Sequence, residues 1–301
     1  MMNPEYYYRN CTWKNVPDTC MVELTNACNF SCIMCSNKFM ARKKGFMNFE
    51  TFKKTLDACK DAEIRNIKLY TTGESLLHPD FMKFWRLAMA YPFDYIMIST
   101  NGLLLSEEII KEILESPKVR IQFSFSGWDK RSYEKRYVGG DFEKAIEKIR
   151  LIMGLIEEKK LPKNTLTING VVSGTTGAIE KTKDFLKSEF NMDESQLKIH
   201  NSNNWIDVVS NKNGNKKNEK SEGKRHYCHI ANTRIGVLYD GKVTACGCLD
   251  VNGELVVGEI NKEGIKEIRN GKLFNELVDK LNDGDISSLM CSNCDSLKII
   301  E

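Results

Sequence analysis

Short β-like runs alternate with longer helical patterns through the first two-thirds of the sequence. The predicted strands are Met21–Thr25, Ile67–Thr71, Tyr95–Ser99, Val119–Phe125, Thr165–Val172 and Leu197–His200. The predicted helices between them are Phe49–Ala62, Phe81–Met89, Glu107–Glu115, Phe142–Glu158 and Ala178–Phe190. Alternation of this kind favours βαβ units and a parallel sheet. We therefore expect an α/β fold in which residues 1–200 form a partial (β/α)6 barrel, similar in plan to a TIM barrel.

Residues 201–227 differ in character from the segment before them. The run from Asn211 to Lys220 contains no apolar side chain and cannot join a hydrophobic core. We interpret 201–227 as a flexible linker or loop.

Residues 228–301 predict a small α+β domain. Thr233–Leu238 and Val243–Ala245 flank Asp240-Gly241, which is a hairpin turn signal. Helical patterns follow at Ile265–Asn270 and Leu273–Leu281. A domain of this size has a small core, so a bound metal would help to stabilise it.

The charge of the chain gives no support for a nucleic-acid partner. Lys and Arg total 44 against 41 Asp and Glu, and the net charge of +3 is scattered along the sequence. No apolar run reaches the length of a membrane span, and the segment from Met1 to Cys20 has no apolar signal core. We expect a cytoplasmic protein that binds neither nucleic acid nor a membrane.

The chain has 11 cysteines, which in a reducing compartment are expected to be metal ligands rather than disulfides. Cys28, Cys32 and Cys35 form a CxxxCxxC group directly after the first predicted strand. Thiolates are soft ligands that suit iron–sulfur clusters or zinc. Three thiolates in one loop can hold three irons of a [4Fe–4S] cube and leave the fourth iron open. The alternative is a zinc site with its fourth ligand elsewhere.

A second group of cysteines lies in the carboxyl-terminal segment. Its members are Cys228, Cys246, Cys248 and the CxxC pair Cys291 and Cys294. Their spacing suits either a zinc ribbon or an iron–sulfur cluster. The other three cysteines are expected to be ordinary buried residues: Cys11, Cys20 and Cys59.

Polar motifs follow the ends of the second, third and fourth predicted strands. They are Thr71-Thr72-Gly73-Glu74-Ser75, Ser99-Thr100-Asn101-Gly102 and Ser124-Phe125-Ser126-Gly127, with Arg136 beyond the last of them. Each motif alone is also explained as a turn, and Arg136 as a solvated helix charge. In barrel folds, however, the carboxyl ends of the strands line the one face that carries the chemistry. We therefore expect these motifs and the first cysteine group to face one cavity.

The CxxxCxxC group resembles the hallmark of the radical S-adenosylmethionine (SAM) superfamily. The resemblance implies that Cys28, Cys32 and Cys35 bind a [4Fe–4S] cluster whose open iron binds the amine and carboxylate of SAM. Gly73-Glu74 resembles the motif that holds the SAM amino group, although Ser75 stands where proline is usual. The other residues implied to bind SAM are Ser99 and Asn101 at the ribose, Ser126, Arg136 at the carboxylate, and Met34 near the adenine, where many members have an aromatic residue.

The second cysteine group resembles the SPASM/twitch domains of many radical SAM enzymes. Gly241 precedes Cys246 in a GxxxxC element that is typical of these domains. The resemblance to the shorter twitch form implies one auxiliary [4Fe–4S] cluster, with its ligands at Cys228, Cys246, Cys291 and Cys294. Cys248 is a fifth candidate that could replace a neighbour as a ligand.

The resemblance also implies a reaction. A one-electron donor such as flavodoxin or ferredoxin reduces the first cluster, and SAM splits into methionine and a 5′-deoxyadenosyl radical that abstracts hydrogen from a substrate. Twitch-type relatives include carbohydrate dehydrogenases, so we expect oxidation of a secondary alcohol on a sugar or cyclitol. The alternatives are maturation of a ribosomally made peptide and, outside enzymes, a non-catalytic zinc-binding protein. His200, at the end of the sixth predicted strand, is the candidate catalytic base, and it is also explained as a structural histidine.

Overall fold

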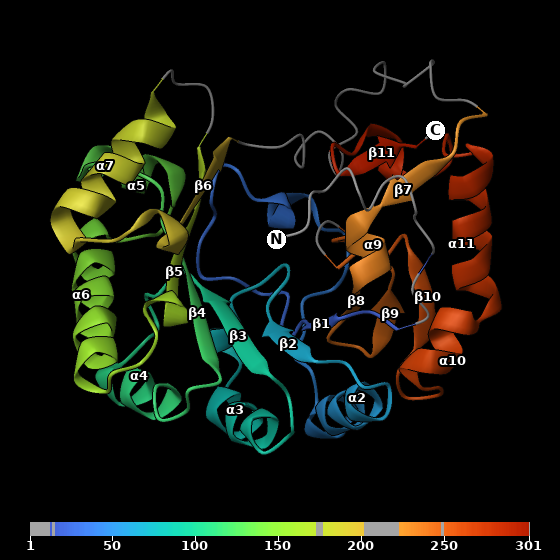
Figure 1. The fold of residues 1–301 in the computed structure, drawn as a ribbon, viewed down its shortest axis with the longest axis horizontal. Helices are drawn as coiled ribbons and strands as arrows, with labels where there is room; N and C mark the ends of the chain where they lie inside the picture. Colours follow the sequence, from blue (N-terminus) through green and yellow to red (C-terminus); the bar gives the residue numbers. More distant parts are fainter. Residues whose placement is uncertain (1–12, 14–15, 173–176, 202–222, 248–249, 301) are drawn as a thin grey trace.

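The computed structural model describes residue 13 and residues 16–172, 177–201, 223–247 and 250–300. Six parallel strands stand side by side in chain order and curve into a partial barrel (Figure 1). They are β1 (Thr19–Val22), β2 (Asn66–Leu69), β3 (Tyr95–Thr100), β4 (Val119–Ser124), β5 (Leu166–Val172) and β6 (Leu197–Asn201). The predicted α/β partial barrel is confirmed, and each predicted strand is present within two residues at either end, except that β1 ends three residues before the predicted Thr25.

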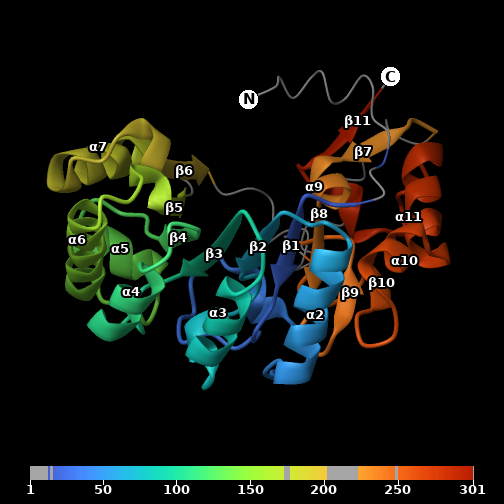
Figure 2. The same ribbon diagram turned by 60° about the horizontal axis from the view of Figure 1, so that its bottom comes forward.

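Helices cover the outer side of the strands (Figure 2). They are α2 (Phe49–Asp61), α3 (Phe81–Met89), α4 (Glu107–Ile113), α5 (Lys130–Arg136), α6 (Phe142–Glu158) and α7 (Ala178–Phe190). Short 3-10 turns join them to the strands at η1 (Ser36–Phe39), η2 (Ser75–Leu77), η3 (Lys163–Thr165) and η4 (Glu194–Gln196). The predicted bounds of α3, α6 and α7 match the structure at both ends, whereas the sequence analysis missed α5.

Polar side chains start several of these helices. Asn48, Ser106 and Asp141 each accept a hydrogen bond from a backbone N–H in the first turn of the helix that follows. Such N-caps satisfy donors that have no partner within the helix and stabilise it by about 1 kcal/mol.

The strands alternate between a face that packs under the helices and a face that lines the concave side of the barrel. In β4, Ile121 and Phe123 are buried in the core, while Gln122 and Ser124, which alternate with them, are only partly buried. Because successive side chains of a strand point to opposite faces, Gln122 and Ser124 belong to the concave side. β4 therefore presents polar side chains to the concave side of the barrel.

The strands of the carboxyl-terminal segment extend the barrel sheet. β8 (Arg234–Val237) pairs in parallel with β1, and the antiparallel strands β9 (Lys242–Thr244) and β10 (Val256–Glu259) follow it, so the sheet has nine strands. The β8–β9 pair confirms the predicted hairpin. Without β8, β1 would expose a row of unpaired backbone groups at a sheet edge.

The rest of the carboxyl-terminal segment packs beside this extension. A separate two-stranded sheet joins β7 to β11, and three helices accompany it (Figure 1). The elements are β7 (His226–Cys228), α9 (His229–Thr233), α10 (Ile265–Asn270), α11 (Lys272–Asp283), η5 (Met290–Asn293) and β11 (Leu297–Ile299).

The loop predicted at 201–227 lies mostly outside the described residues, which resume at 223. Three of its residues differ from the prediction: Asn201 ends β6, and His226 and Tyr227 belong to β7. Tyr227 is buried, and its hydroxyl accepts a hydrogen bond from Asn232, so the two β7 residues are tied into the domain that follows. Among the described residues, no helix is both long and apolar enough to cross a membrane.

Candidate functional site

The first cysteine group lies in the loop between β1 and η1. Cys28, Cys32 and Cys35 are all partly buried. The backbone N–H groups of Phe30 and Asn37 point at the sulfurs of Cys28 and Cys35, at 3.5 and 3.4 Å. Hydrogen bonds of this kind to sulfur help to set the properties of iron–sulfur clusters.

Burial suppresses ionisation of these thiols in the protein without a bound cofactor. It raises the pKa of Cys28 to about 11 and that of Cys32 to about 12, and it raises the pKa of Cys35 as well. The neighbouring cysteines raise the pKa of Cys32 further, which shows that the three sulfurs lie within electrostatic reach of one another. A bound cationic metal would reverse this balance by stabilising the thiolates.

The donors of the first cysteine loop are three thiols. A four-iron cluster places each cysteine on a different iron, so three cysteines leave one iron open. The all-sulfur donor set and its N–H contacts suit such a cluster.

Gly73 joins the end of β2 to the cysteine loop. A side chain at this position would bring its Cβ to 2.3 Å from the carbonyl oxygen of Thr25 and 2.5 Å from that of Ala27. The next residue, Glu74, donates its backbone N–H to Ala27 at 2.8 Å. Gly73 is thus needed for contact between two backbone segments of the chain itself, and its role toward SAM stays a prediction.

Glu74 is a buried carboxylate, with 2% of its surface exposed. Its two oxygens accept hydrogen bonds from the backbone N–H groups of Asn101 (2.8 Å) and Leu76 (3.2 Å). Burial raises the pKa of Glu74 to about 7, and these hydrogen bonds act in the opposite direction. A carboxylate in this position would be stabilised by an ammonium group, as the predicted contact with the SAM amine requires.

Asn101 connects the third strand end to the cysteine loop. Its amide Nδ2 donates to the side-chain oxygen of Asn29 at 2.8 Å, and Asn29 lies directly after Cys28. The amide nitrogen of Asn29 is buried and has no acceptor among the described residues. A ligand with an acceptor oxygen at this place would satisfy it. Sequence reasoning missed Asn29 because it lies at one of the unspecified positions of the CxxxCxxC motif.

The other residues predicted to bind SAM occupy different surroundings. Ser99 lies on the concave side of β3 and accepts a 3.4 Å hydrogen bond from Gln122. Ser126 is fully buried and donates its hydroxyl to the carbonyl of Val171 at 3.0 Å. Met34 is partly buried and packs against the core. The hydroxyl of Ser126 is therefore hydrogen-bonded to the backbone. The side chain of Ser99, in contrast, belongs to the concave side of the barrel.

Arg136 is buried at the end of α5. Its guanidinium donates to the carbonyl of Ser132 at 3.0 Å and lies 5.6 Å from the ring of Trp128. Its own carbonyl accepts the N–H of Ile33 inside the cysteine loop, at 3.0 Å. Arg136 is thus attached to that loop through its backbone, and its contact with the SAM carboxylate stays a prediction.

His200 lies on the exposed side of the edge strand β6, opposite Val171 of β5. Burial lowers its pKa below the usual 6.5, and the positive charges of Lys198 and Lys183 lower it further. His200 is therefore neutral at pH 7 and able to accept a proton. His78, in contrast, is a structural residue that bonds to the backbone of Met47 and Asp80.

The four cysteines predicted to hold the second cluster meet at one pocket. Cys228, Cys246, Cys291 and Cys294 line it together, although 18 to 45 residues separate some of them in the sequence. The rest of the lining is almost entirely aliphatic, from Ile230, Ala231, Ala245, Leu255, Leu277, Leu281 and Leu297. Four thiols that converge in an apolar pocket suit a closed iron–sulfur site.

Electrostatics at this second pocket resemble those at the first. Burial raises the pKa of Cys291, and negative charge on Cys228, Cys294 and Asp250 would raise it further. The backbone N–H of Ala231 points at the sulfur of Cys228 at 3.5 Å. Cys248 and Cys11 lie outside the described residues. Cys20 and Cys59 are buried in the core, as expected.

A buried ion pair joins the two cysteine regions. Glu23, just after β1, binds the guanidinium of Arg42, which lies beyond η1, and the two hydrogen bonds measure 2.9 and 2.8 Å. Arg42 also donates to the carbonyl of Val251, and Thr71 donates to Glu23. The pair therefore connects the first cysteine loop, the end of β2 and the segment after Cys246. The sequence analysis missed it.

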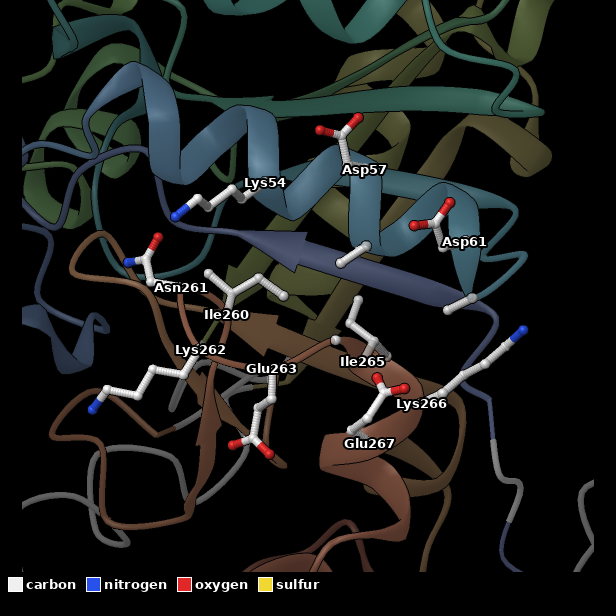
Figure 3. Close-up of a pocket in the computed structure, with 13 residues that line it drawn as sticks. Lys54, Asp57, Asp61, Ile260, Asn261, Lys262, Glu263, Ile265, Lys266 and Glu267 are labelled. Atoms are coloured by element: carbon white, nitrogen blue, oxygen red, sulfur yellow. The ribbon is translucent and has the colours of Figure 1, made fainter.

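A separate cavity of about 370 Å³ opens between α2 and the segment from Ile260 to Glu267 (Figure 3). Its lining mixes acidic and basic side chains, among them Lys54, Asp57, Asp61 and Lys266. No residue that the sequence assigned to the site lines this cavity.

Comparisons with known proteins give the chain a family. The model of the radical SAM superfamily matches residues 22–186, more than half of the chain. A second model, an iron–sulfur cluster-binding domain named SPASM, matches residues 228–295. The chain is 36% identical over 104 residues to the tungsten-containing aldehyde ferredoxin oxidoreductase cofactor-modifying protein of Pyrococcus furiosus, a match that spans 34% of this chain and 29% of that protein.

Two solved structures share the fold. BtrN, solved in complex with AdoMet (SAM) and 2-DOIA, is 17% identical with a TM-score of 0.55, and the match covers 94% of both chains. SuiB of Streptococcus suis, solved with its precursor peptide SuiA, is 12% identical with a TM-score of 0.67, and the match covers 93% of this chain and 72% of SuiB.

The family model, the fold and the two cysteine sites agree. The cofactors that follow are SAM, a [4Fe–4S] cluster and auxiliary iron–sulfur chemistry in the SPASM region. The chain belongs to the radical SAM superfamily and is a radical SAM enzyme with a SPASM domain.

Proposed function

We propose that this enzyme oxidises a secondary alcohol of a sugar or cyclitol to a ketone. The observation that carries the proposal is the meeting of Cys228, Cys246, Cys291 and Cys294 at one apolar pocket. Four thiolates would close a cluster to outside ligands, which leaves electron transfer as its chemistry. Removal of a hydrogen atom from an alcohol carbon leaves a radical, and such an electron acceptor lets that radical become a ketone.

The similarity to BtrN supports the small-molecule substrate. The two chains match over 94% of both lengths, so their parts correspond from end to end. The 2-DOIA in that structure is BtrN's ligand, and we extend its chemical class, an alcohol-bearing ring, to this chain. The matched segments of the first three curated relatives span only 29% to 46% of those proteins, so their activities are not transferred.

Each part of the candidate site has a role in this proposal. Cys28, Cys32 and Cys35 would hold the first cluster, and Glu74 would hold the amine of SAM. A [4Fe–4S] cluster bound there supplies the electron that cleaves SAM into methionine and a 5′-deoxyadenosyl radical. The buried position of Glu74 and its two backbone hydrogen bonds fix the carboxylate before SAM binds.

The oxidation must balance in atoms and electrons. The alcohol loses a hydrogen atom from carbon, one further electron, and the proton of its hydroxyl group. The hydrogen atom forms 5′-deoxyadenosine, and the electron leaves toward the acceptor at the second pocket. His200 is the group we propose to take the proton, since its lowered pKa keeps it neutral at pH 7.

Peptide maturation is a second candidate function. The observation that favours it is the similarity to SuiB, whose structure contains a precursor peptide and whose TM-score of 0.67 exceeds the 0.55 of BtrN. In that case the concave side of the barrel would receive a peptide segment instead of a ring.

The test uses protein reconstituted without oxygen, SAM, a reductant, and sugars or cyclitols that carry deuterium at the alcohol carbon. We expect deuterium in 5′-deoxyadenosine and one ketone for each 5′-deoxyadenosine. Formation of 5′-deoxyadenosine without a ketone from any member of the panel would contradict the alcohol oxidation. Deuterium transfer from a peptide encoded beside the gene would favour the second candidate.

A further inference from the structure

Two large apolar side chains are exposed at the first cysteine loop. Ile33 is 41% exposed and Val138 is 47% exposed, and they are two of only five large apolar residues that are exposed in the described part of the chain. Backbone hydrogen bonds hold their segments together, from Ser31 to Val138 at 2.8 Å and from Ile33 to Arg136 at 3.0 Å. The two side chains therefore belong to neighbouring segments, and Ile33 stands between the predicted ligands Cys32 and Cys35 in the sequence.

Basic side chains border this apolar pair. The ammonium group of Lys38 lies 2.9 Å from the carbonyl oxygen of Ile33 and is exposed. Lys44 is also exposed, and the backbone groups of its neighbours Lys43 and Gly45 bond to the side chain of Asn26, two residues before Cys28.

The sequence around these lysines is strongly biased. From Ser36 to Met47 the chain has four basic residues and no acidic one. Arg42 is committed to Glu23, which leaves three lysines in this stretch as surface charges. A basic rim around a small apolar centre is the pattern of a surface that receives an acidic partner.

We propose that Ile33, Val138, Lys38 and Lys44 form the docking surface for a small acidic one-electron carrier protein. The proposal rests on the reductive cleavage of SAM and not on the identity of the substrate. An electron has to enter at Cys28, Cys32 and Cys35, and this surface is the outer side of the loop that carries them. The carrier loses one electron, the chain gains it, and no atom is exchanged.

The size and charge of the surface suit a brief encounter. A partner that delivers one electron must bind, transfer and leave, and weak redox complexes have small interfaces. Opposite charges at the rim speed the encounter and make it sensitive to salt. We therefore expect the rate with a protein donor to fall as ionic strength rises, while the rate with a small inorganic reductant does not follow the same dependence.

The experiment compares two reductants on the reconstituted holoenzyme. The measured quantity is the initial rate of 5′-deoxyadenosine formation from SAM without substrate, first with a reduced flavodoxin at several concentrations and then with dithionite. The variants are Val138→Glu and Lys38→Glu, with Val138→Lys as a size-matched partner of opposite charge. Lys266→Glu on α10 is the control, since it makes the same charge change beside the cavity of Figure 3.

We expect Val138→Glu and Lys38→Glu to lower kcat/KM for flavodoxin by roughly 10-fold or more, because removal of electrostatic steering has effects of this order. The value of kcat/KM for flavodoxin should fall less in Val138→Lys than in Val138→Glu, and it should not change in Lys266→Glu. Iron content and the dithionite rate should stay as in the unchanged protein.

Two results would overturn the proposal. Equal losses of the 5′-deoxyadenosine rate with flavodoxin and with dithionite would mean that the substitutions disturb the cysteine loop. Lys38→Glu is the variant to watch for this effect, because Lys38 bonds to the carbonyl of Ile33. Unchanged flavodoxin kinetics in both glutamate variants would place the docking surface elsewhere. Failure of the unchanged protein to form 5′-deoxyadenosine even with dithionite would instead contradict the reductive cleavage of SAM on which the proposal rests.

Discussion

The carboxylate of Glu23 is completely buried and is bound by both terminal nitrogens of the Arg42 guanidinium, at 2.9 and 2.8 Å. Glu23 follows the first barrel strand, and Arg42 follows the first cysteine loop. Tyr239, beyond β8, donates its backbone N–H to Glu23, and Val251 accepts from Arg42. One ion pair therefore ties the first cysteine loop to the segment around Cys246.

Removal of one partner of this pair should destabilise the protein strongly. We expect Arg42→Met to lower the free energy of unfolding by about 3–5 kcal/mol, because it leaves a buried carboxylate unpaired. The control is Arg65→Met, which breaks an exposed pair with Asp94 and should cost less than about 1 kcal/mol. Denaturant unfolding under nitrogen measures both. Similar losses of unfolding free energy in the two variants would show that the buried pair stabilises the protein no more than an exposed pair does.

Gly73 should not tolerate a methyl group. In Gly73→Ala the new Cβ would meet the backbone of Thr25 and Ala27, which cannot move aside as a side chain can. We expect a loss of about 1–3 kcal/mol from this overpacking and weaker SAM binding. Gly154→Ala is the matched control, since Gly154 is exposed in α6 with nothing within 4 Å of the added Cβ. It should stabilise the helix by about 1 kcal/mol.

Iron content should report the two cysteine sites separately. Reconstituted protein should hold about eight irons per chain, and Cys291→Ala should hold about four, because loss of one of four thiolates opens the second site. Cys59→Ala removes a thiol that lies in the core and should leave the iron content unchanged. Iron and sulfide analysis measures this, and zinc in place of iron would contradict the cluster assignment.

The amine-binding role of Glu74 can be tested by Glu74→Gln. The amide keeps the size of the carboxylate but loses the charge that would attract an ammonium group. We expect SAM binding to weaken by about 10- to 100-fold, since a hydrogen bond to a charged group contributes about 1.5–3 kcal/mol. Calorimetric titration of the reconstituted protein with SAM measures the affinity, and unchanged affinity would remove Glu74 from the binding site.

The pKa of His200 should respond to its lysine neighbours. Burial and the charges of Lys198 and Lys183 disfavour the protonated ring, so its pKa lies below 6.5. Lys198→Met removes one positive charge and should therefore raise the pKa of His200, whereas Lys159→Met, beside Glu115, should not. NMR titration of the His200 ring proton measures this pKa in each variant. If His200 takes the alcohol proton, the acid limb of the rate profile moves upward with this pKa.

Periodicity was enough to predict the barrel. The bounds of α3, α6 and α7 follow from apolar residues at helical spacing, which is a local property of the sequence. The short elements α5, β7 and β11 were missed; in α5, for example, Tyr133 is the one buried apolar residue, so the helix shows no apolar repeat. Tyr227 was assigned to a loop for the same reason, although the domain core buries it.

The sequence by itself determined the kind of chemistry. The spacing of Cys28, Cys32 and Cys35 keeps three soft ligands in one loop, whatever the rest of the chain does, and the strand–helix alternation directs Glu74 and Ser99 to the same end of the barrel. Only the tertiary structure decided which distant residues meet. Asn101 reaches Asn29, and Glu23 pairs with Arg42, because strand pairing and burial bring these segments together. Such contacts depend on the whole fold, so no local pattern encodes them.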